Sequence, residues 1–305
     1  MHKYNRTPSQ VLVGNYALIF ILLILDSFHF VFARLLYPHI APELSVFYVL
    51  IIGTIEVGLY GLITRKIRWQ ILKDNIWFFL VLGLFIAGST YINYASMGFI
   101  DPGTAALLNQ SSTIFGVILG LLWLRESFKP LQFVGAAIAL VGIVIFTFQA
   151  GDYLRIGSVL ILFASLLYSS HAAITKKMGG HIDFINFFFF RLLSTSAFLF
   201  LTAAGTKSLA VPDLKTIGLL VLVASVDIGI SRSLYYVVLR RMNISLMTVI
   251  LTLSPVITVF WSFLLFKTLP GIQQLVGGSV VMAGVLLVAL AREQLMKIKK
   301  VTEHP

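Results

Sequence analysis

The chain has 305 residues, of which 58% are hydrophobic and 11% are charged, with a formal net charge of +11. Soluble domains carry about 25% charged residues, so this composition excludes a water-exposed globular fold. The chain holds no cysteine, which excludes disulfides, thiol catalysis and thiolate metal sites.

Apolar stretches long enough to cross a bilayer follow one another along nearly the whole chain. About 20 apolar residues in a helix span the roughly 30 Å hydrocarbon core. The connections are short, leave no room for a soluble domain, and contain no GxxxxGK[ST] phosphate loop. We therefore expect an all-α integral membrane protein with ten transmembrane helices, at 12–36, 43–64, 76–99, 103–124, 130–149, 156–176, 184–204, 214–239, 243–266 and 270–291.

Basic residues are distributed unequally between the two sides of these helices. Of the 23 Lys and Arg residues, 16 fall in segments on the side of the N-terminus, five fall on the other side and two lie within helices. By the positive-inside rule this bias predicts a plasma-membrane protein with both termini in the cytoplasm. No soluble basic face exists for nucleic acid, so we expect membrane lipids and small molecules as partners.

An internal repeat sets the expected architecture. Sliding the chain on itself by 142 residues aligns it without gaps from the first helix of each half to the fifth. Five is an odd number, so the second copy enters the membrane from the opposite side, which predicts inverted repeats at 1–150 and 151–292, followed by a basic cytoplasmic tail at 293–305. Residues that coincide include His29 with His171, Ser89 with Ser231, Tyr94 with Tyr236, Gly135 with Gly277, and Gly142 with Gly284.

Inverted repeats are typical of secondary transporters, whose sites lie near the midplane between the repeats. They predict alternating access, in which the two halves rock about the site. The alternative is a duplicated membrane scaffold without transport.

The third to fifth helices of each half resemble the drug/metabolite transporter superfamily, EamA-type. The segment from Tyr91 to Phe146 and its echo from Ser233 to Val288 carry the resemblance. The family pattern places an aromatic late in the third helix, a Pro within the fourth, a Glu after the fourth and a Gly-rich fifth. Here these are Tyr94 and Tyr236, Pro255, Glu126, and the glycine pairs 135/142 and 277/284.

Two departures from that pattern concern the fourth helix of each repeat. Thr113 stands where the first-repeat Pro would be, and Thr268 stands where the second-repeat Glu would be. A basic residue common in the second and seventh helices survives only as Arg191. The resemblance implies a gradient-driven carrier, but it leaves the cargo open because the superfamily is chemically diverse.

Small residues and one proline mark places where helices approach or bend. Glycines let membrane helices approach closely, and we expect Gly116, Gly120, Gly135, Gly142, Gly277 and Gly284 to pack within the chain or, alternatively, to support a weak homodimer. Pro255 removes a backbone hydrogen bond and predicts a kink in helix nine, which could serve the site or only the packing.

Seven ionisable residues fall within the predicted helices, where a charge is costly and usually functional. They are Asp26, His29, Glu56, His171, Arg191, Asp227 and Arg232. Asp26 and His29 share a helix face. At about 100° per residue, Asp227 and Arg232 lie about 140° apart, which predicts a polar wedge without a direct ion pair.

We expect helices one, three, six and eight to line a central cavity for a small polar solute. Carboxylates and a guanidinium suit an amino-acid-like zwitterion, with Arg232 or Arg191 holding a carboxylate and Asp227 or Asp26 meeting an amine. Asp26, Glu56 and Arg191 are candidates for proton coupling or for pairing, and in the structural alternative Arg191 only pairs with an acid. The expected substrate-binding residues are His29, Asn93, Tyr94, His171, Asp227, Ser231, Arg232 and Tyr235.

Other classes of function fit the sequence less well. An exporter of cationic drugs or amines is the main alternative. An intramembrane enzyme lacks a GxSxG elbow, and His29 and His171 have no HxxxH partner, so we expect no catalysis, cofactor or metal. A channel is usually a symmetric oligomer, whereas this symmetry lies within one chain, which is expected to be a monomer or weak homodimer.

Overall fold

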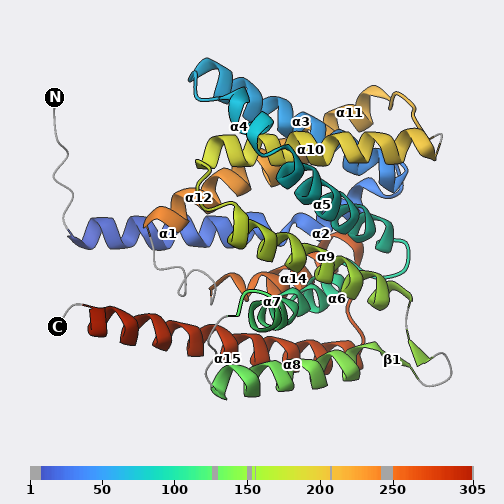
Figure 1. Ribbon diagram of the computed structural model, residues 1–305. Helices are drawn as coiled ribbons and strands as arrows, with labels where there is room; N and C mark the ends of the chain where they lie inside the picture. Colours follow the sequence, from blue (N-terminus) through green and yellow to red (C-terminus); the bar gives the residue numbers. More distant parts are fainter. Residues whose placement is uncertain are drawn as a thin grey trace.

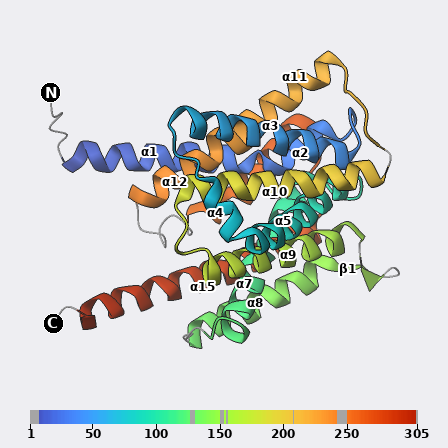
Figure 2. The same ribbon diagram turned by 45° about the horizontal axis from the view of Figure 1, so that its top comes forward.

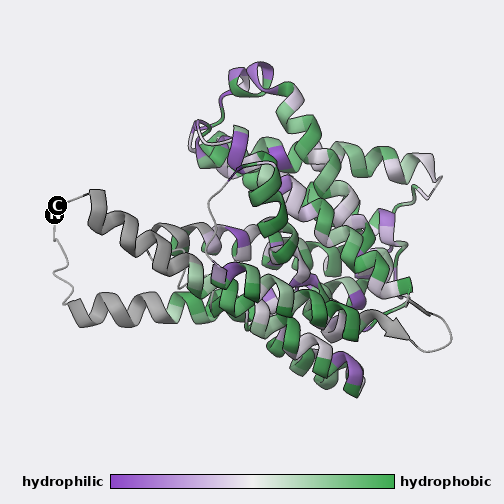
Figure 3. Cartoon of the chain, turned by 60° about the horizontal axis from the view of Figure 1, so that its bottom comes forward, coloured by the Kyte–Doolittle hydropathy of each residue, from purple (hydrophilic) through white to green (hydrophobic). Residues whose placement is uncertain are grey.

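The computed structural model describes residues 8–125, 130–149, 153–154, 156–206, 208–241 and 250–303. Among them, eight helices are long and apolar enough to cross a membrane, and two shorter apolar helices, Pro130–Phe146 and Ser254–Phe266, lie at the predicted fifth and ninth positions. Hydrophobic residues make up most of the helical ribbon coloured by hydropathy in Figure 3. Glu126 and the first part of the ninth predicted helix lie outside the described residues.

The helices form one bundle in which α1 begins and α15 ends on the same side, opposite the β1 strand (Figures 1 and 2). The first repeat comprises α1 (Pro8–Ser27), α2 (His29–Leu36), α3 (Pro42–Ile63), α4 (Trp69–Asp74), α5 (Ile76–Ser96), α6 (Pro102–Asn109), α7 (Ser111–Leu122) and α8 (Pro130–Thr147). The second comprises α9 (Ile156–Met178), α10 (Phe184–Gly205), α11 (Leu214–Val223), the π-helix η1 (Ala224–Ser231), α12 (Arg232–Arg241), α14 (Ser254–Phe266) and α15 (Ile272–Glu303).

A short antiparallel ladder joins the two halves, with β1 (Phe148–Gln149) paired to β2 (Tyr153–Leu154). The all-helical prediction does not include it. α15 is longer than expected, because its helical backbone continues from the predicted span through the predicted tail to Glu303.

Two helices that were expected to be continuous are interrupted. The first predicted helix breaks between α1 and α2, where the Thr258 hydroxyl donates to the Ser27 carbonyl (2.8 Å) that the break leaves without a helical partner. The fourth breaks at Gln110, where Ser169 donates to the nearby Ser112 carbonyl (2.6 Å). The hydrogen bond from Thr258 on α14 therefore stabilises the first of these interruptions inside an apolar bundle.

Pro255 lies in the first turn of α14 instead of in the middle of a kinked helix. The turn before it is closed by backbone bonds from Leu253 N to the Ile250 carbonyl and from Val256 N to the Leu253 carbonyl, both 3.0 Å. Proline is tolerated at a helix start because its missing N–H would be unsatisfied there in any case. Thr252 precedes this break and is the repeat equivalent of Gln110, so both repeats are interrupted at the same position.

The predicted eighth helix contains the π-helical segment η1, with α-helix on both sides. In a π-helix the backbone hydrogen bonds join residues i and i+5. Two residues that are five positions apart therefore lie closer to one face of the helix than they would in an α-helix. Asp227 and Arg232 are five apart, and both line one cavity. The predicted separation of about 140° assumed α-helical geometry, which this segment does not have.

α8 and α15 pack backbone to backbone through glycines from both repeats. A Cβ atom on Gly135 would lie 2.7 Å from the Gly284 carbonyl, and one on Gly277 would lie 2.7 Å from Phe146 N. A Cβ atom on Gly142 would lie 2.6 Å from Val281 N. The 142-residue offset exchanges the Gly135–Gly284 and Gly142–Gly277 contacts, so the interface is symmetric about the pseudo-two-fold axis.

The other predicted glycine pair behaves differently. Gly120 is buried on α7, but Gly116 is exposed and has open space where a Cβ atom would stand. The close approach expected at Gly116 is therefore absent within the described chain.

A second symmetric contact joins α3 and α10 on the other side of the bundle (Figure 1). The Thr54 and Ser196 hydroxyls lie 3.1 Å apart, and these residues are separated by 142 positions. Repeat equivalents that touch each other must lie on the pseudo-two-fold axis. The α3–α10 contact and the α8–α15 contact thus bracket the centre of the bundle.

Asp183 caps the first turn of α10 outside the membrane-spanning part. It accepts hydrogen bonds from Asn186 N (3.2 Å) and from the Arg68 guanidinium (2.8 Å). Partial burial acts to raise the pKa of Asp183, but the bonds from Arg68 and Asn186 outweigh it, so the pKa lies below its ordinary value of 3.8.

Because the folded-state pKa of Asp183 is depressed, its charge stabilises the fold above pH 3.8, and this stabilisation is lost as pH falls through the lower folded-state value. Asp183→Asn keeps a capping side chain but removes the charge, and it is expected to cost under about 1 kcal/mol at pH 7 because the ion pair is exposed. Thermal unfolding in detergent at pH 7 and pH 3 measures this. An unchanged difference between variant and wild type at the two pH values would contradict it.

Candidate functional site

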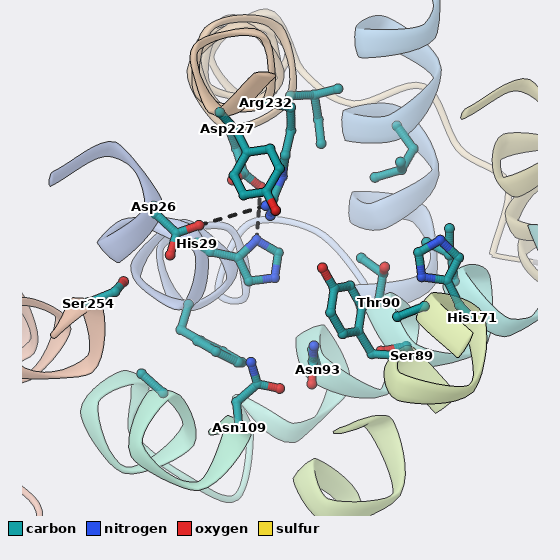
Figure 4. Close-up of a pocket in the computed structure, with 18 of the residues that line it drawn as sticks. Asp26, His29, Ser89, Thr90, Asn93, Asn109, His171, Asp227, Arg232 and Ser254 are labelled. Carbon is teal, nitrogen blue, oxygen red and sulfur yellow. Dashed lines mark hydrogen bonds and ion pairs between the residues drawn. The ribbon is translucent and has the colours of Figure 1, made fainter. Parts of the chain in front are cut away.

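A polar cavity of about 470 Å³ lies at the centre of the bundle, between the two symmetric contacts. Figure 4 shows side chains from both repeats pointing into it. Its ionisable and amide-bearing lining residues are Asp26, His29, Asn93, Asn109, Gln110, His171, Lys176, Arg191, Asp227 and Arg232.

One acid–base pair in the cavity joins α2 to η1, and it is an ion pair when His29 is protonated. His29 Nδ1 lies 2.9 Å from Asp227 Oδ2, and the Asp227 side chain is only 2% exposed. Asp227 Oδ1 has no hydrogen-bond partner in the described part of the chain. This carboxylate is therefore held by His29 through one oxygen, while the other oxygen retains its accepting capacity.

A second pair joins α1 to α12, beside the first (Figure 4). Arg232 Nη1 lies 3.7 Å from Asp26 Oδ1, and the side chains are 27% and 30% exposed. The two pairs connect the first predicted helix with the eighth across the boundary between the repeats. We name these four residues, Asp26, His29, Asp227 and Arg232, the paired cluster.

Local backbone irregularity positions the paired cluster. Asp26 lies in the last turn of α1, which ends at Ser27, and His29 begins α2, so the break at Phe28 separates two side chains that both reach the cavity. Asp227 lies within η1, and Arg232 begins α12 directly after it. All four charged positions therefore flank or occupy an interruption of regular α-helix.

α5 supplies an uncharged polar wall. Ser89, Thr90, Asn93 and Tyr94 line the cavity. Ser89 is occupied by a hydrogen bond to the Ala164 carbonyl (2.8 Å), whereas Asn93 Oδ1 and Tyr94 Oη are buried without a hydrogen-bond partner among the described residues. The Tyr94 ring meets the His29 ring edge-on, with centroids 6.2 Å apart.

α9 and α10 supply a basic end of the cavity. His171 is 6% exposed, and Lys176 at the end of α9 is exposed, so the cavity extends from the bundle centre to that end of the helix. The Arg191 guanidinium lies over the Phe188 ring at 5.1 Å and the Phe187 ring at 5.9 Å from their centroids. These rings hold the guanidinium beside the cavity wall.

The structure brings most of the predicted site residues together. His29, Asn93, Tyr94, His171, Asp227, Arg232 and Tyr235 line the cavity, as do Asp26, Arg191 and Pro255. Two do not belong to the lining. Ser231 is buried on η1 beside it, and Glu56 instead accepts a hydrogen bond from Ser225 on η1.

Several lining residues were not predicted. Lys176 was placed in a cytoplasmic segment, yet it lines the cavity because α9 continues to Met178. Asn109, Gln110, Ser254 and Thr258 come from the interrupted fourth and ninth helices. A signal for the first pair exists in the sequence, since two adjacent amides in an apolar helix are rarely turned towards lipid.

Among the described residues, no group of three or more His, Cys, Asp or Glu side chains could hold a metal ion. The cavity instead offers charged pairs, amides and aromatic rings. Such a lining suits the reversible binding of a small polar solute.

Comparisons with known proteins agree with this architecture. The uncharacterized transporter YdfC of Bacillus subtilis (strain 168) is 28% identical over 263 residues, which cover 84% of this chain and 85% of that protein. A crystal structure of a protein whose function is not stated is 18% identical in sequence, and the match covers 92% of this chain and 99% of the other chain. The TM-score of 0.64 shows that the two chains share a fold. The model of the EamA-like transporter family matches residues 15–148 and 155–290, once for each repeat, and the chain is therefore a member of that family of multi-pass membrane proteins.

Proposed function

We propose that this chain is a secondary transporter that carries a small zwitterionic, amino-acid-like solute through the central cavity by alternating access. One observation carries the proposal: the paired cluster joins opposite repeats through the His29–Asp227 and Arg232–Asp26 pairs inside a polar cavity. A charge inside an apolar bundle is costly, and it is retained where it meets a substrate or ion. A cavity of about 470 Å³ accommodates a solute of amino-acid size.

The paired cluster provides a binding surface for an amine. Asp227 Oδ1 has accepting capacity that no described residue uses, and Tyr94 lies beside its partner His29. An ammonium group there gains a charge-assisted hydrogen bond and a nearby aromatic wall. A cationic amine without a carboxylate would use the same carboxylate, so export of amines is the second candidate.

Protons are proposed as the coupling ion. Protonation of Asp227 would remove the charge that holds both His29 and the substrate amine. A proton and the amine therefore compete for one carboxylate, which is the requirement for exchange. An imposed pH gradient is expected to drive uptake into proteoliposomes, and uptake that is the same with and without the gradient would rule out this coupling.

The transporter proposal is tested with purified protein in liposomes. We expect saturable flux of at least one member of a panel of labelled amino acids, and acceleration of that flux when the same unlabelled amino acid is trapped inside. Counterflow of this kind requires a carrier that alternates between two faces. A flux that rises linearly with concentration would indicate a channel, and no flux from a panel of amino acids, amines and nucleosides would reject the proposed function.

Within the cell, we propose a plasma-membrane location with both termini in the cytoplasm, supported by the distribution of Lys and Arg. The cavity is lined by one chain, so a monomer suffices for the site.

A further inference from the structure

His171 is a buried polar side chain with an unusual environment. Neither Nδ1 nor Nε2 has a hydrogen-bond partner among the described residues, although the side chain lines the cavity and the residue is 6% exposed. Burying an imidazole without partners is unfavourable, because it loses its hydrogen bonds to water. Because His171 lines the cavity, a solute bound there can supply the missing partner.

The repeat explains why His171 has no partner while its equivalent does. His29 is the equivalent of His171 and pairs with Asp227. The position equivalent to Asp227 in the first repeat is Phe85, and the position equivalent to Asp26 is Tyr168. The second repeat therefore presents the histidine without either carboxylate, and the ring of Tyr168 lies beside the His171 ring, at 5.6 Å between centroids.

The charges around His171 have one sign. Arg191 from α10 and Lys176 from α9 line the cavity on this side, and in the described lining the only carboxylates are Asp26 and Asp227 of the paired cluster. Figure 4 shows His171 across the cavity from His29 and Asp227, with Thr90 between them. Both carboxylates of the described lining thus lie in the paired cluster with His29 and Arg232, whereas His171, Arg191 and Lys176 belong to another part of the lining.

We propose that His171, Arg191 and Lys176 form an anion subsite that binds the carboxylate of the substrate, while Asp227 of the paired cluster binds its amine. This assignment rests on the proposed function and fixes the orientation of the solute. It assigns the carboxylate to the second repeat, whereas Arg232, the alternative guanidinium, lies against Asp26. The subsite selects zwitterions against simple amines, because an amine leaves the ring nitrogens of His171 without a hydrogen-bond partner.

Binding to purified protein in detergent tests the subsite through the rise in apparent unfolding temperature. The probes are a panel of L-amino acids, their carboxamides, their N-acetyl derivatives and inorganic phosphate. For wild type we expect at least one amino acid to bind about tenfold or more tightly than its carboxamide, since a hydrogen bond to a charged group contributes that factor. Lys176→Met and His171→Leu are expected to remove this preference and to leave the preference over the N-acetyl derivative unchanged.

Two matched variants serve as controls. Lys177 is adjacent to Lys176 but lies over the Trp123 ring, 4.5 Å from its centroid, and His181 bonds Asn75 at 3.2 Å. Neither residue lines the cavity. Lys177→Met and His181→Leu are expected to bind the panel as wild type does.

A second readout separates a binding role from a structural one. If His171 awaits a ligand, His171→Leu removes an unsatisfied polar group and raises the apparent unfolding temperature of the ligand-free protein, by roughly 2 °C. If His171 is purely structural, His171→Leu should instead lower the apparent unfolding temperature.

The binding and flux measurements separate the anion subsite from the proposed function. Equal binding of an amino acid and its carboxamide, or a His171→Leu variant that binds as wild type does, would overturn the proposed anion subsite while leaving the transport proposal intact. Binding of phosphate in place of every amino acid would overturn the carboxylate assignment. Absence of any flux in liposomes would instead reject the proposed function itself.

Discussion

Replacing Asp227 by asparagine is expected to lower the initial rate of solute flux by roughly 10- to 100-fold. The substitution keeps the size of the side chain but removes the charge that pairs with His29 and, in the proposed mechanism, with the substrate amine. A hydrogen bond to a charged group contributes about 1.5–3 kcal/mol, and about 1.4 kcal/mol corresponds to a factor of ten. Flux of labelled amino acid into proteoliposomes, corrected for the amount of folded protein, measures the loss.

Glu56 provides the matched control for Asp227. It is a second acid within the bundle, on α3, but it bonds Ser225 and lies outside the residues that line the cavity. Glu56→Gln is expected to retain flux within about threefold of wild type, since the side chain does not line the cavity and a glutamine carbonyl can still accept the hydrogen bond from Ser225. Equal losses for the two variants would mean that the cavity is not the transport site.

The second large effect concerns the fold. Gly142→Leu is expected to destabilise the protein by about 3 kcal/mol or more, because its Cβ atom would fall 2.6 Å from Val281 N and 2.8 Å from the Gly277 carbonyl. Both are backbone atoms and cannot rotate away, so α8 and α15 must separate along their contact. The apparent unfolding temperature in detergent, together with the fraction that elutes as a single monodisperse species, reports the loss.

The matched comparison uses alanine at two glycines. Gly142→Ala already places a Cβ atom in the contact and should lower the unfolding temperature. Gly116→Ala meets open space and should raise it slightly, because alanine is favoured over glycine in a helix by about 0.5–1 kcal/mol. The same sign for both substitutions would contradict the α8–α15 packing.

Hydropathy and the internal repeat predicted the positions of the membrane spans and the contacts that follow from the symmetry of the two halves. Membrane spans follow from the energetics of apolar side chains in lipid, so their positions are visible in a window of sequence. The 142-residue offset is more informative than hydropathy, because it also identifies equivalent positions that can contact each other on the pseudo-two-fold axis. Thr54 and Ser196, and the paired glycines of α8 and α15, contact each other as that symmetry requires.

The interruptions could not be predicted because their stabilisation comes from other helices. The break after α1 is supported by Thr258, which lies 231 residues away from Ser27. The π-helical segment η1 has an α-helical equivalent in α5, so the repeat itself gives no indication of it. These irregular segments decide which charges meet, and the sequence therefore identified the residues of the cluster but not their pairing.

The glycine contact between α8 and α15 has a consequence for the genetics of this protein. In most cores, an oversized substitution can be relieved by shortening the side chain it strikes. Here the atoms nearest to Gly135, Gly142, Gly277 and Gly284 belong to the opposing backbone, which no codon change can shorten. Revertants of a Gly142→Leu strain should therefore restore a small residue at position 142 itself, while second-site suppressors elsewhere on the α8–α15 interface should be rare.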